Sequence, residues 1–271
     1  MIITNILKGI RKKLIASKQK SRFAPIPWLT ERILKNEPDN LIKQRQFDGF
    51  VLNYIRPYEV VKTYKEIFAQ EIYRFTAKND SPVILDCGAN IGLSCIYFKT
   101  TYPNAIVHAY EPDSKLFEVL KKNIEVNGFS KVTLHQAAIW IEDTNLSFEN
   151  KGSEASHIDL SGKSGNSVKA LSLASQLDQF EHIDLLKMDI EGAEFEVVQS
   201  CTSHLHKVEN FFLEYHGKVN ETNKLVTLLD IVKNAGFQVY IKMAADNLQS
   251  PLYQKSTGEI YDVQLNIFCY K

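Results

Sequence analysis

No uninterrupted apolar segment in this sequence approaches the roughly 20 residues that a membrane-spanning helix needs. Cysteine is scarce, with four residues, none in a CxxC pair and none in a Cys/His cluster with zinc spacing. Neither charge is in excess, because 32 basic residues balance 32 acidic ones. These absences argue against a membrane-spanning protein, a zinc module and a protein that binds nucleic acid through its bulk charge. We therefore expect a cytoplasmic protein with free, reduced thiols.

Acidic residues are also missing from positions 1–22, which carry seven basic ones. Five apolar residues there recur at helical spacing, namely Ile3, Ile6, Leu7, Ile10 and Leu14. Such a basic amphipathic helix suits the surface of an anionic membrane, which would place the protein at the inner membrane face. The alternative is a helix that packs on its own domain or on the second subunit of a homodimer. The sequence leaves both open.

A polar segment at residues 78–81 divides the sequence into two parts. Residues 1–78 indicate an extension that is helical up to about residue 45, with one strand at 49–55 and another helix from 57 to 75; we expect it to cap the site or to contact the substrate or a second subunit. Residues 79–271 alternate between apolar strands and amphipathic helices, apart from a loop-rich stretch before a strand at 183–188. This alternation predicts an α/β fold, in which a parallel sheet has helices on both faces and ends in an antiparallel hairpin.

The segment DCGANIG follows the first strand of this second part and predicts a ligand site. Gly88 lets the backbone approach a ligand, and Gly92 lets the next helix begin close to the strand. After Ala89, Asn90 stands where a dinucleotide fingerprint has its second glycine, so its side chain would crowd a pyrophosphate. Asp86 would repel phosphates but attract an ammonium group. The loop therefore favours an amino-acid moiety over a diphosphate.

The second strand ends in AYEPD, where Glu111 and Pro112 follow the loop by about one helix and one strand. An acid at that point can accept hydrogen bonds from both hydroxyls of a ribose. An amino acid joined to a ribose without phosphate is S-adenosylmethionine. Gln136 and Ala137, at the end of the third strand, are expected to line the adenine ring. A nicotinamide-dependent oxidoreductase is the alternative, which Asp86 and the missing glycine argue against.

Three segments in this order, DCGANIG, YEPD and LLKMDIEGAE, resemble the motifs of the FkbM family of S-adenosylmethionine-dependent methyltransferases. The resemblance covers about residues 73–217. It implies a Rossmann-like, seven-stranded class I methyltransferase sheet of order 3-2-1-4-5-7-6 with strand 7 antiparallel. It also implies O-methylation of sugars or other biosynthetic products. Matched residue by residue, it assigns the cofactor loop to Asp86, Gly88, Asn90 and Gly92, the ribose to Glu111, the motif after strand four to Asp189, and the capping of the cofactor pocket to Tyr73.

A hydroxyl acceptor must lose a proton, so the site needs a base or a metal ion. Asp189 and Glu191 follow the fourth strand, while Glu214 and His216 lie two apart on the fifth and point the same way. These four residues are the candidate catalytic groups. Glu194 is expected merely to complement the dipole of its helix. Mg²⁺ held by Asp189 and Glu214 is an alternative, but we predict no metal.

The expected partner is a small-molecule or glycan acceptor. Nucleic acid is not expected, because no NPPY-like tetrapeptide follows the fourth strand to stack a flipped base. A third function stays open beside the methyltransferase and the oxidoreductase. It is a protein that binds S-adenosylmethionine without catalysis.

Overall fold

The computed structural model describes residues 21–271 except 150–156, 159–165, 249, 257 and 259. The amphipathic helix predicted within residues 1–22 therefore lies almost entirely outside the described residues, and its membrane or subunit contacts stay predictions. Among the described residues, no helix combines the length and apolar character needed to cross a membrane.

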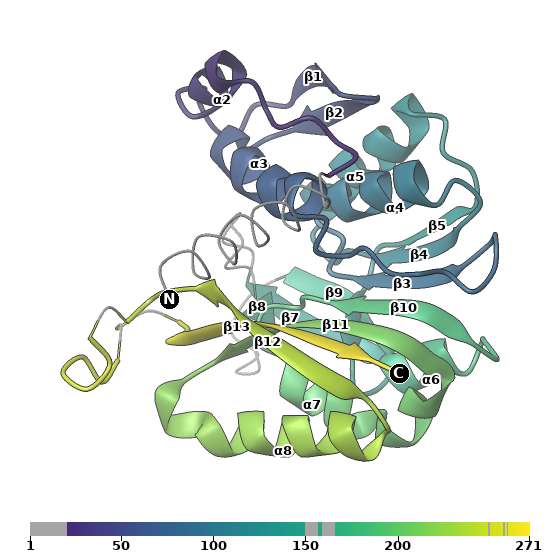
Figure 1. Ribbon diagram of the computed structural model, residues 1–271, viewed down its shortest axis with the longest axis vertical. Coiled ribbons are helices and arrows are strands. Elements are labelled where there is room, and N and C mark those ends of the chain that lie inside the picture. The colour runs from purple at the N-terminus through teal and green to yellow at the C-terminus, as the bar shows by residue number, and fades with distance from the viewer. Residues whose placement is uncertain (1–20, 150–156, 159–165, 249, 257, 259) are drawn as a thin grey trace, which may run out of the picture.

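A seven-stranded sheet forms the centre of the molecule, with helices on both sides (Figure 1). Its order is β12-β13-β11-β10-β3-β4-β5, and β13 runs antiparallel to both of its neighbours while the other pairs are parallel. When these seven strands are numbered 1 to 7 in chain order, their order in the sheet is the expected 3-2-1-4-5-7-6. The predicted class I methyltransferase topology is therefore confirmed. The strands are β3 (Val83–Cys87), β4 (Ile106–Tyr110), β5 (Val132–His135), β10 (Ile183–Met188), β11 (Val208–Gly217), β12 (Gln238–Ala245) and β13 (Val263–Tyr270).

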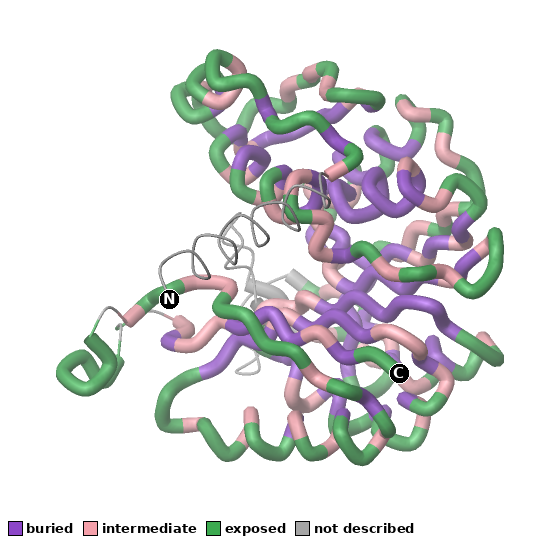
Figure 2. Tube along the Cα trace, in the orientation of Figure 1, coloured by how far each residue is buried: buried purple, intermediate pink, exposed green. Residues whose placement is uncertain are grey.

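Two apolar clusters hold the helices against the two faces of this sheet, and Figure 2 shows the buried residues gathered there. One face carries α4 (Leu93–Thr101) and α5 (Ser114–Val126). The opposite face carries α6 (Leu173–Leu177), α7 (Glu194–Ser200) and α8 (Thr222–Asn234), with the short helices η2 (Thr202–Lys207) and η3 (Val219–Glu221). Asp113 caps α5 by accepting hydrogen bonds from two N–H groups of its first turn, which satisfies donors that the helix leaves unpaired.

The N-terminal part differs from the mainly helical expectation. It contains α2 (Trp28–Leu34), the antiparallel pair β1 (Lys43–Phe47) and β2 (Phe50–Tyr54), α3 (Pro57–Tyr64), and a π-helical turn η1 (Lys65–Ala69). The predicted strand near 49–55 is confirmed as β2. The predicted helix at 57–75 ends too late, because the π turn closes it at Ala69. Strand β1 was not expected, since its sequence KQRQF is almost wholly polar.

Two asparagine side chains, Asn123 of α5 and Asn127 at the C-cap of this helix, fix this N-terminal part to the sheet domain. The Asn123 amide accepts from the Asn53 N–H at 2.6 Å and donates to the Asn53 carbonyl at 2.9 Å. Asn127 makes the same pair of bonds with the backbone of Val51, at 2.8 and 2.7 Å. The free edge of β2 is thus satisfied by side chains. This docking holds α3, which follows β2, above the carboxyl edge of the central sheet; the domain boundary at residues 78–79 stays a prediction.

A second, smaller sheet occupies the stretch that the sequence indicated to be loop-rich, so that expectation is wrong. It has the order β6-β9-β7-β8, formed by β6 (Ala138–Trp140), β7 (Thr144–Glu149), β8 (His157–Ile158) and β9 (Asn166–Ser172). The segment between its strands is rich in glycine and serine, which hid the alternation of apolar residues.

Candidate active site

The loop after β3 has an unusual backbone conformation, because three of its residues have positive φ. Gly88, Asn90 and Gly92 have φ of +81°, +50° and +86°. The N–H groups of Gly88 and Ala89 both donate to the Tyr110 carbonyl, which fastens the loop to the end of β4. The loop therefore lies across the carboxyl ends of the first two parallel strands, where ligands of such folds bind.

The packing of the protein itself leaves little room for a side chain at either glycine, and the restriction is strictest at Gly88, where the near atom belongs to the backbone. A Cβ on Gly88 would lie 1.8 Å from the carbonyl oxygen of Asp189, at the end of the neighbouring strand β10. A Cβ on Gly92 would lie 2.5 Å from Cδ1 of Leu120 in α5. The expected close approach at Gly92 is thus present, but its partner is α5 rather than the strand. Any side chain at Gly88 would separate the loop from β10.

The side chain of Asp86 has polar partners within the protein itself. Its carboxylate is fully buried and accepts a hydrogen bond from the Ser94 hydroxyl. Its Oδ1 lies 3.2 Å from Nζ of Lys187, a buried residue of β10. The ammonium partner of Asp86 in this structure is therefore Lys187, and direct contact of Asp86 with a ligand's ammonium group stays a prediction.

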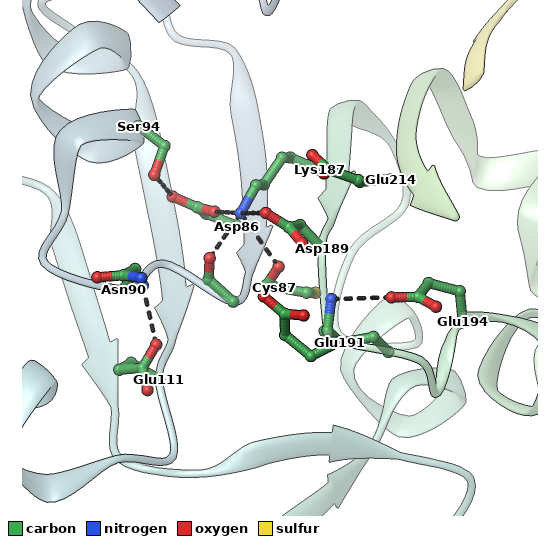
Figure 3. A network of polar contacts seen from close by, with 12 residues as sticks. Asp86, Cys87, Asn90, Ser94, Glu111, Lys187, Asp189, Glu191, Glu194 and Glu214 are labelled. Atoms are coloured by element: carbon green, nitrogen blue, oxygen red, sulfur yellow. Dashed lines mark hydrogen bonds and ion pairs between the residues drawn. The ribbon is translucent and has the colours of Figure 1, made fainter. Parts of the chain in front are cut away.

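Lys187 is a site residue that the sequence analysis missed. Its ammonium group donates to the Gly88 carbonyl at 2.6 Å and lies 3.9 Å from Oδ2 of Asp189 (Figure 3). Burial acts to lower the pKa of Lys187, but the carboxylates of Asp86 and Asp189 outweigh burial and raise this pKa. Lys187 of β10 thus holds the glycine loop in place through the carbonyl of Gly88. Its signal in the sequence is a lysine inside the otherwise apolar core of strand LLKM, since buried charges are rare unless paired.

Glu111 lies at the end of β4 with both carboxylate oxygens facing backbone donors. Oε2 accepts from the Asn90 N–H and Oε1 from the Asp113 N–H, each at 2.8 Å. Burial raises the pKa of Glu111 to about 7, although these N–H groups oppose the shift. Each oxygen of a carboxylate has two lone pairs, so each can accept one more hydrogen bond. That arrangement fits a pair of ribose hydroxyls; Pro112, half-buried, follows in the same turn.

The two residues expected at the adenine ring lie beside Glu111, outside the main cavity. The Glu111 N–H donates to the His135 carbonyl, which joins the ends of β4 and β5. Gln136 and Ala137 follow directly, Gln136 exposed and Ala137 buried. Gln136 is thus the one of the two whose side chain is accessible.

A cavity of about 360 Å³ opens between the glycine loop and the N-terminal part. One wall is the loop itself with Gly88 and Asn90, and the opposite wall is α3. Tyr73, expected as a cap, also lines this cavity and packs edge-on against Phe212 at 4.8 Å between ring centroids. The N-terminal part thus supplies a wall of the cavity, in keeping with the expected role in substrate contact.

The candidate catalytic residues all line this cavity, at the carboxyl ends of β10 and β11. Ligand atoms of Asp189, Glu214 and His216 lie within 4.8 Å of one another. The imidazole Nε2 of His216 lies 3.7 Å from a carboxylate oxygen of Glu214 and 3.7 Å from one of Glu191. Burial, and then repulsion from Asp189, raises the pKa of Glu214 to about 8. The cavity therefore has a concentrated group of titratable side chains next to the glycine loop.

Glu194 contributes far more than the expected complement to a helix dipole. It is fully buried, and its Oε1 accepts from the Gly192 N–H at 3.0 Å and lies 3.1 Å from Nδ1 of His216. Burial acts to lower the pKa of His216, but the Glu194 carboxylate outweighs burial and raises this pKa to about 10. The imidazole is thus protonated near neutral pH while Glu194 is its partner.

A mixed sheet of this order with one antiparallel strand, a glycine loop after its first strand and an acid after its second defines a class I S-adenosylmethionine-dependent methyltransferase. The chain belongs to the FkbM family: residues 86–239 match the family model described as the methyltransferase FkbM domain. It is accordingly an enzyme whose cofactor is S-adenosylmethionine. This result excludes the oxidoreductase and the non-catalytic alternative.

Curated relatives come from fungi and bacteria. Methyltransferase 1 of Beauveria bassiana is 27% identical over 210 residues, covering 68% of this chain and 83% of that protein. Methyltransferase sdnD of Sordaria araneosa is 30% identical over 188 residues, covering 56% and 73%. The 2-O-methyltransferase NoeI of Sinorhizobium fredii is 25% identical over 193 residues, covering 64% and 76%. A crystal structure of Methyltransferase FkbM from Methylobacillus flagellatus KT aligns with a TM-score of 0.47 at 17% identity, covering 72% of this chain and 45% of that one.

Proposed function

We propose that this methyltransferase methylates a hydroxyl group of a small molecule or a glycan. The observation that carries the proposal is the cluster of Asp189, Glu214 and His216 in the cavity beside the glycine loop. A hydroxyl has a pKa far above 7 and is a poor nucleophile until it loses its proton. Asp189, Glu214 and His216 line the cavity, so they can accept a proton from a hydroxyl acceptor or orient it.

The cofactor's place follows from the same geometry. Its amino-acid end suits the loop of Gly88, Ala89, Asn90 and Gly92, its ribose suits Glu111 beside Pro112, and its adenine suits the exposed Gln136 next to Ala137. Tyr73 lines the cavity together with Asp189, which suits its predicted role as a cap of the cofactor pocket. When bound, S-adenosylmethionine supplies an electrophilic methyl group on a sulfonium, which needs no further activation.

The protein's task is then to align the acceptor, to exclude water and to receive one proton. With the cofactor bound, the acceptor oxygen would bond to the methyl carbon as the carbon–sulfur bond breaks, and the hydroxyl proton would pass to the carboxyl groups of Asp189 or Glu214, because the His216 imidazole already carries a proton. Glu191, which also lines the cavity and lies 3.7 Å from Nε2 of His216, is a further acid next to this cluster. The relative named as a 2-O-methyltransferase supports an oxygen acceptor.

We expect Glu111 to make cofactor binding depend on pH. Burial raises its pKa to about 7, so in the free protein the carboxyl gains a proton as the pH falls below that value. A protonated carboxyl loses an acceptor position for the ribose hydroxyls. The Kd of S-adenosylhomocysteine, measured by calorimetry, should therefore be up to about tenfold higher at pH 6 than at pH 8.

The matched variants for this test are Glu111→Gln and Glu125→Gln, the second on the exposed face of α5. Glu111→Gln should bind more weakly at pH 8 and show little dependence on pH, while Glu125→Gln should behave like the natural protein. A dependence that persists unchanged in Glu111→Gln would assign the titration to another group.

The proposed reaction is tested with labelled S-adenosylmethionine and a panel of saccharides and hydroxylated small molecules. With an accepted substrate, Asp189→Asn and Glu214→Gln should each lower kcat by about 100-fold or more, since positioned proton acceptors contribute factors of that size. Affinity for S-adenosylhomocysteine should stay within about threefold, a difference below 1 kcal/mol. Glu196→Gln, an equal charge change on α7 where Glu196 pairs with Lys224, is the control. Products methylated on nitrogen or carbon, or full turnover by both cluster variants, would refute the proposal.

A further inference from the structure

Three side chains at the carboxyl edge of the sheet form a mixed oxygen and nitrogen donor set. Asp189 follows β10, and Glu214 and His216 belong to its neighbour β11, with one ligand atom of each within 4.8 Å of the others. The imidazole is buried, with its side chain 2% exposed, while both carboxylates reach the cavity. An open cavity on one side leaves room for water or substrate to complete a coordination shell.

The imidazole is oriented as a metal-binding histidine is. Its Nδ1 lies 3.1 Å from the Glu194 carboxylate, which the N–H groups of Ile190 and Gly192 hold in place. Nε2 therefore faces the carboxylates of Glu191 and Glu214. Histidines that bind metals almost always hydrogen-bond a carboxylate or carbonyl through the other ring nitrogen, which fixes the tautomer and the ring direction.

A second observation concerns a buried polar side chain on the adjacent strand, opposite Glu214. Asn266 of β13 pairs directly with Glu214, and side chains of directly opposed residues lie on the same face of a sheet. Its Oδ1 is buried and has no hydrogen-bond partner among the described residues. A buried amide oxygen without a partner costs about 1–3 kcal/mol, and a donor such as a metal-bound water would remove this cost.

We propose that Asp189, Glu214 and His216 bind one divalent cation, with Asn266 accepting from a water molecule of its shell. A cation of this size holds oxygen ligands at about 2.1 Å, so small rotations of the two carboxylates bring the set into range. Two carboxylates with one imidazole favour Mn²⁺ or Mg²⁺ over the softer metals that cysteine-rich sites take. This replaces the earlier expectation of no metal.

The proposed cation binding is supported by these contacts alone. The catalytic role of the cation rests on the proposed function. A cation at this point would lower the pKa of a hydroxyl that binds it and would orient the acceptor. The proton released from the hydroxyl then passes to solvent or to Glu191, which lies at the cavity wall. Vicinal hydroxyls, which can chelate one cation, are the acceptor class that such a site favours.

The experiment uses the full chain, stripped of metal with a chelator, and follows Mn²⁺ binding by electron paramagnetic resonance without cofactor or acceptor. We expect one site that Mg²⁺ competes for. Asp189→Asn, Glu214→Gln and His216→Gln should each raise the Kd for Mn²⁺ at least about tenfold, and Glu194→Gln, through the imidazole, by about 10- to 100-fold. Asp178→Asn and Glu196→Gln, which change acids paired on the surface with Lys207 and Lys224, should leave the Kd unchanged.

Circular dichroism and thermal melting confirm that each variant is folded. If the buried substitution His216→Gln prevents folding, the Mn²⁺ affinity of Glu214→Gln tests the site instead, because the Glu214 side chain is 22% exposed. The inference is overturned if the natural protein binds no Mn²⁺ up to about 1 mM, the weak end of biological cation sites. It is also overturned if the cluster variants bind Mn²⁺ as tightly as the two controls.

Turnover separates the site from the proposed reaction. If Mn²⁺ binds as described and a hydroxyl is methylated only with the cation present, both hold. If Mn²⁺ binds but the chelator leaves O-methylation intact, the site stands and its catalytic role is rejected. If the product is methylated on nitrogen or carbon, the proposed function fails while the binding data keep their meaning.

Discussion

Replacing Gly88 with alanine should abolish cofactor binding and lower the free energy of unfolding by about 3 kcal/mol or more, a loss in the range of severe single substitutions. The added Cβ would lie 1.8 Å from the Asp189 carbonyl oxygen, which is backbone and has no rotamer to escape into. The φ of +81° adds strain for any residue other than glycine. The loop must therefore separate from β10, and the ligand groups on either side move apart. Urea unfolding and calorimetry with S-adenosylhomocysteine measure the two effects.

Gly128→Ala is the matched control for this prediction. Gly128 follows α5 with φ of +64°, and no described atom lies within 4 Å of the position of its Cβ. It shares the backbone strain without the collision and should cost about 1 kcal/mol, with cofactor binding unchanged. Equal losses in the two variants would mean that positive φ, not the contact between loop and β10, makes Gly88 necessary.

Lys187→Met is expected to lower the free energy of unfolding by about 3–5 kcal/mol, because it leaves the buried carboxylate of Asp86 without its ion-pair partner. It also removes the donor that holds the Gly88 carbonyl at 2.6 Å, so affinity for S-adenosylhomocysteine should fall as well. Chemical unfolding and calorimetry check both expectations.

Two comparisons show whether the ion pair is the cause. Lys99→Met removes another buried ammonium group, which donates to the carbonyls of Pro103 and Ala105, and should cost less, about 1–3 kcal/mol. Adding Asp86→Asn to Lys187→Met should recover part of the lost stability, because the unpaired buried charge disappears. A double variant no more stable than Lys187→Met would contradict the ion-pair explanation.

The strands and helices of the sheet domain could be predicted where apolar periodicity was uninterrupted. The predicted bounds of β10, 183–188, agree with the structure, and the strand predicted at 49–55 is present as β2. The small sheet and β1 could not be predicted in the same way. Their strands are short or polar, and pairing with distant segments, rather than local pattern, makes them strands.

Within the site, the sequence located the loop and the acids but not their partners. The ion pair of Asp86 was not predicted, because nothing local shows that Lys187, far along the chain, lies 3.2 Å away. Glu194 was taken for a helix-end acid because its contact with His216 exists only after β11 packs beside α7. Spacing within a motif reveals which residues share an edge of the sheet; it does not reveal which of them neutralise each other.

A crystal structure with S-adenosylhomocysteine tests the central claim most directly. We predict that both ribose hydroxyls donate to the Glu111 carboxylate, that the amino-acid end lies along the loop from Gly88 to Asn90, and that the sulfur faces Asp189, Glu214 and His216. If the ribose lies elsewhere, or if the sulfur faces away from that cluster, the account of this active site is contradicted.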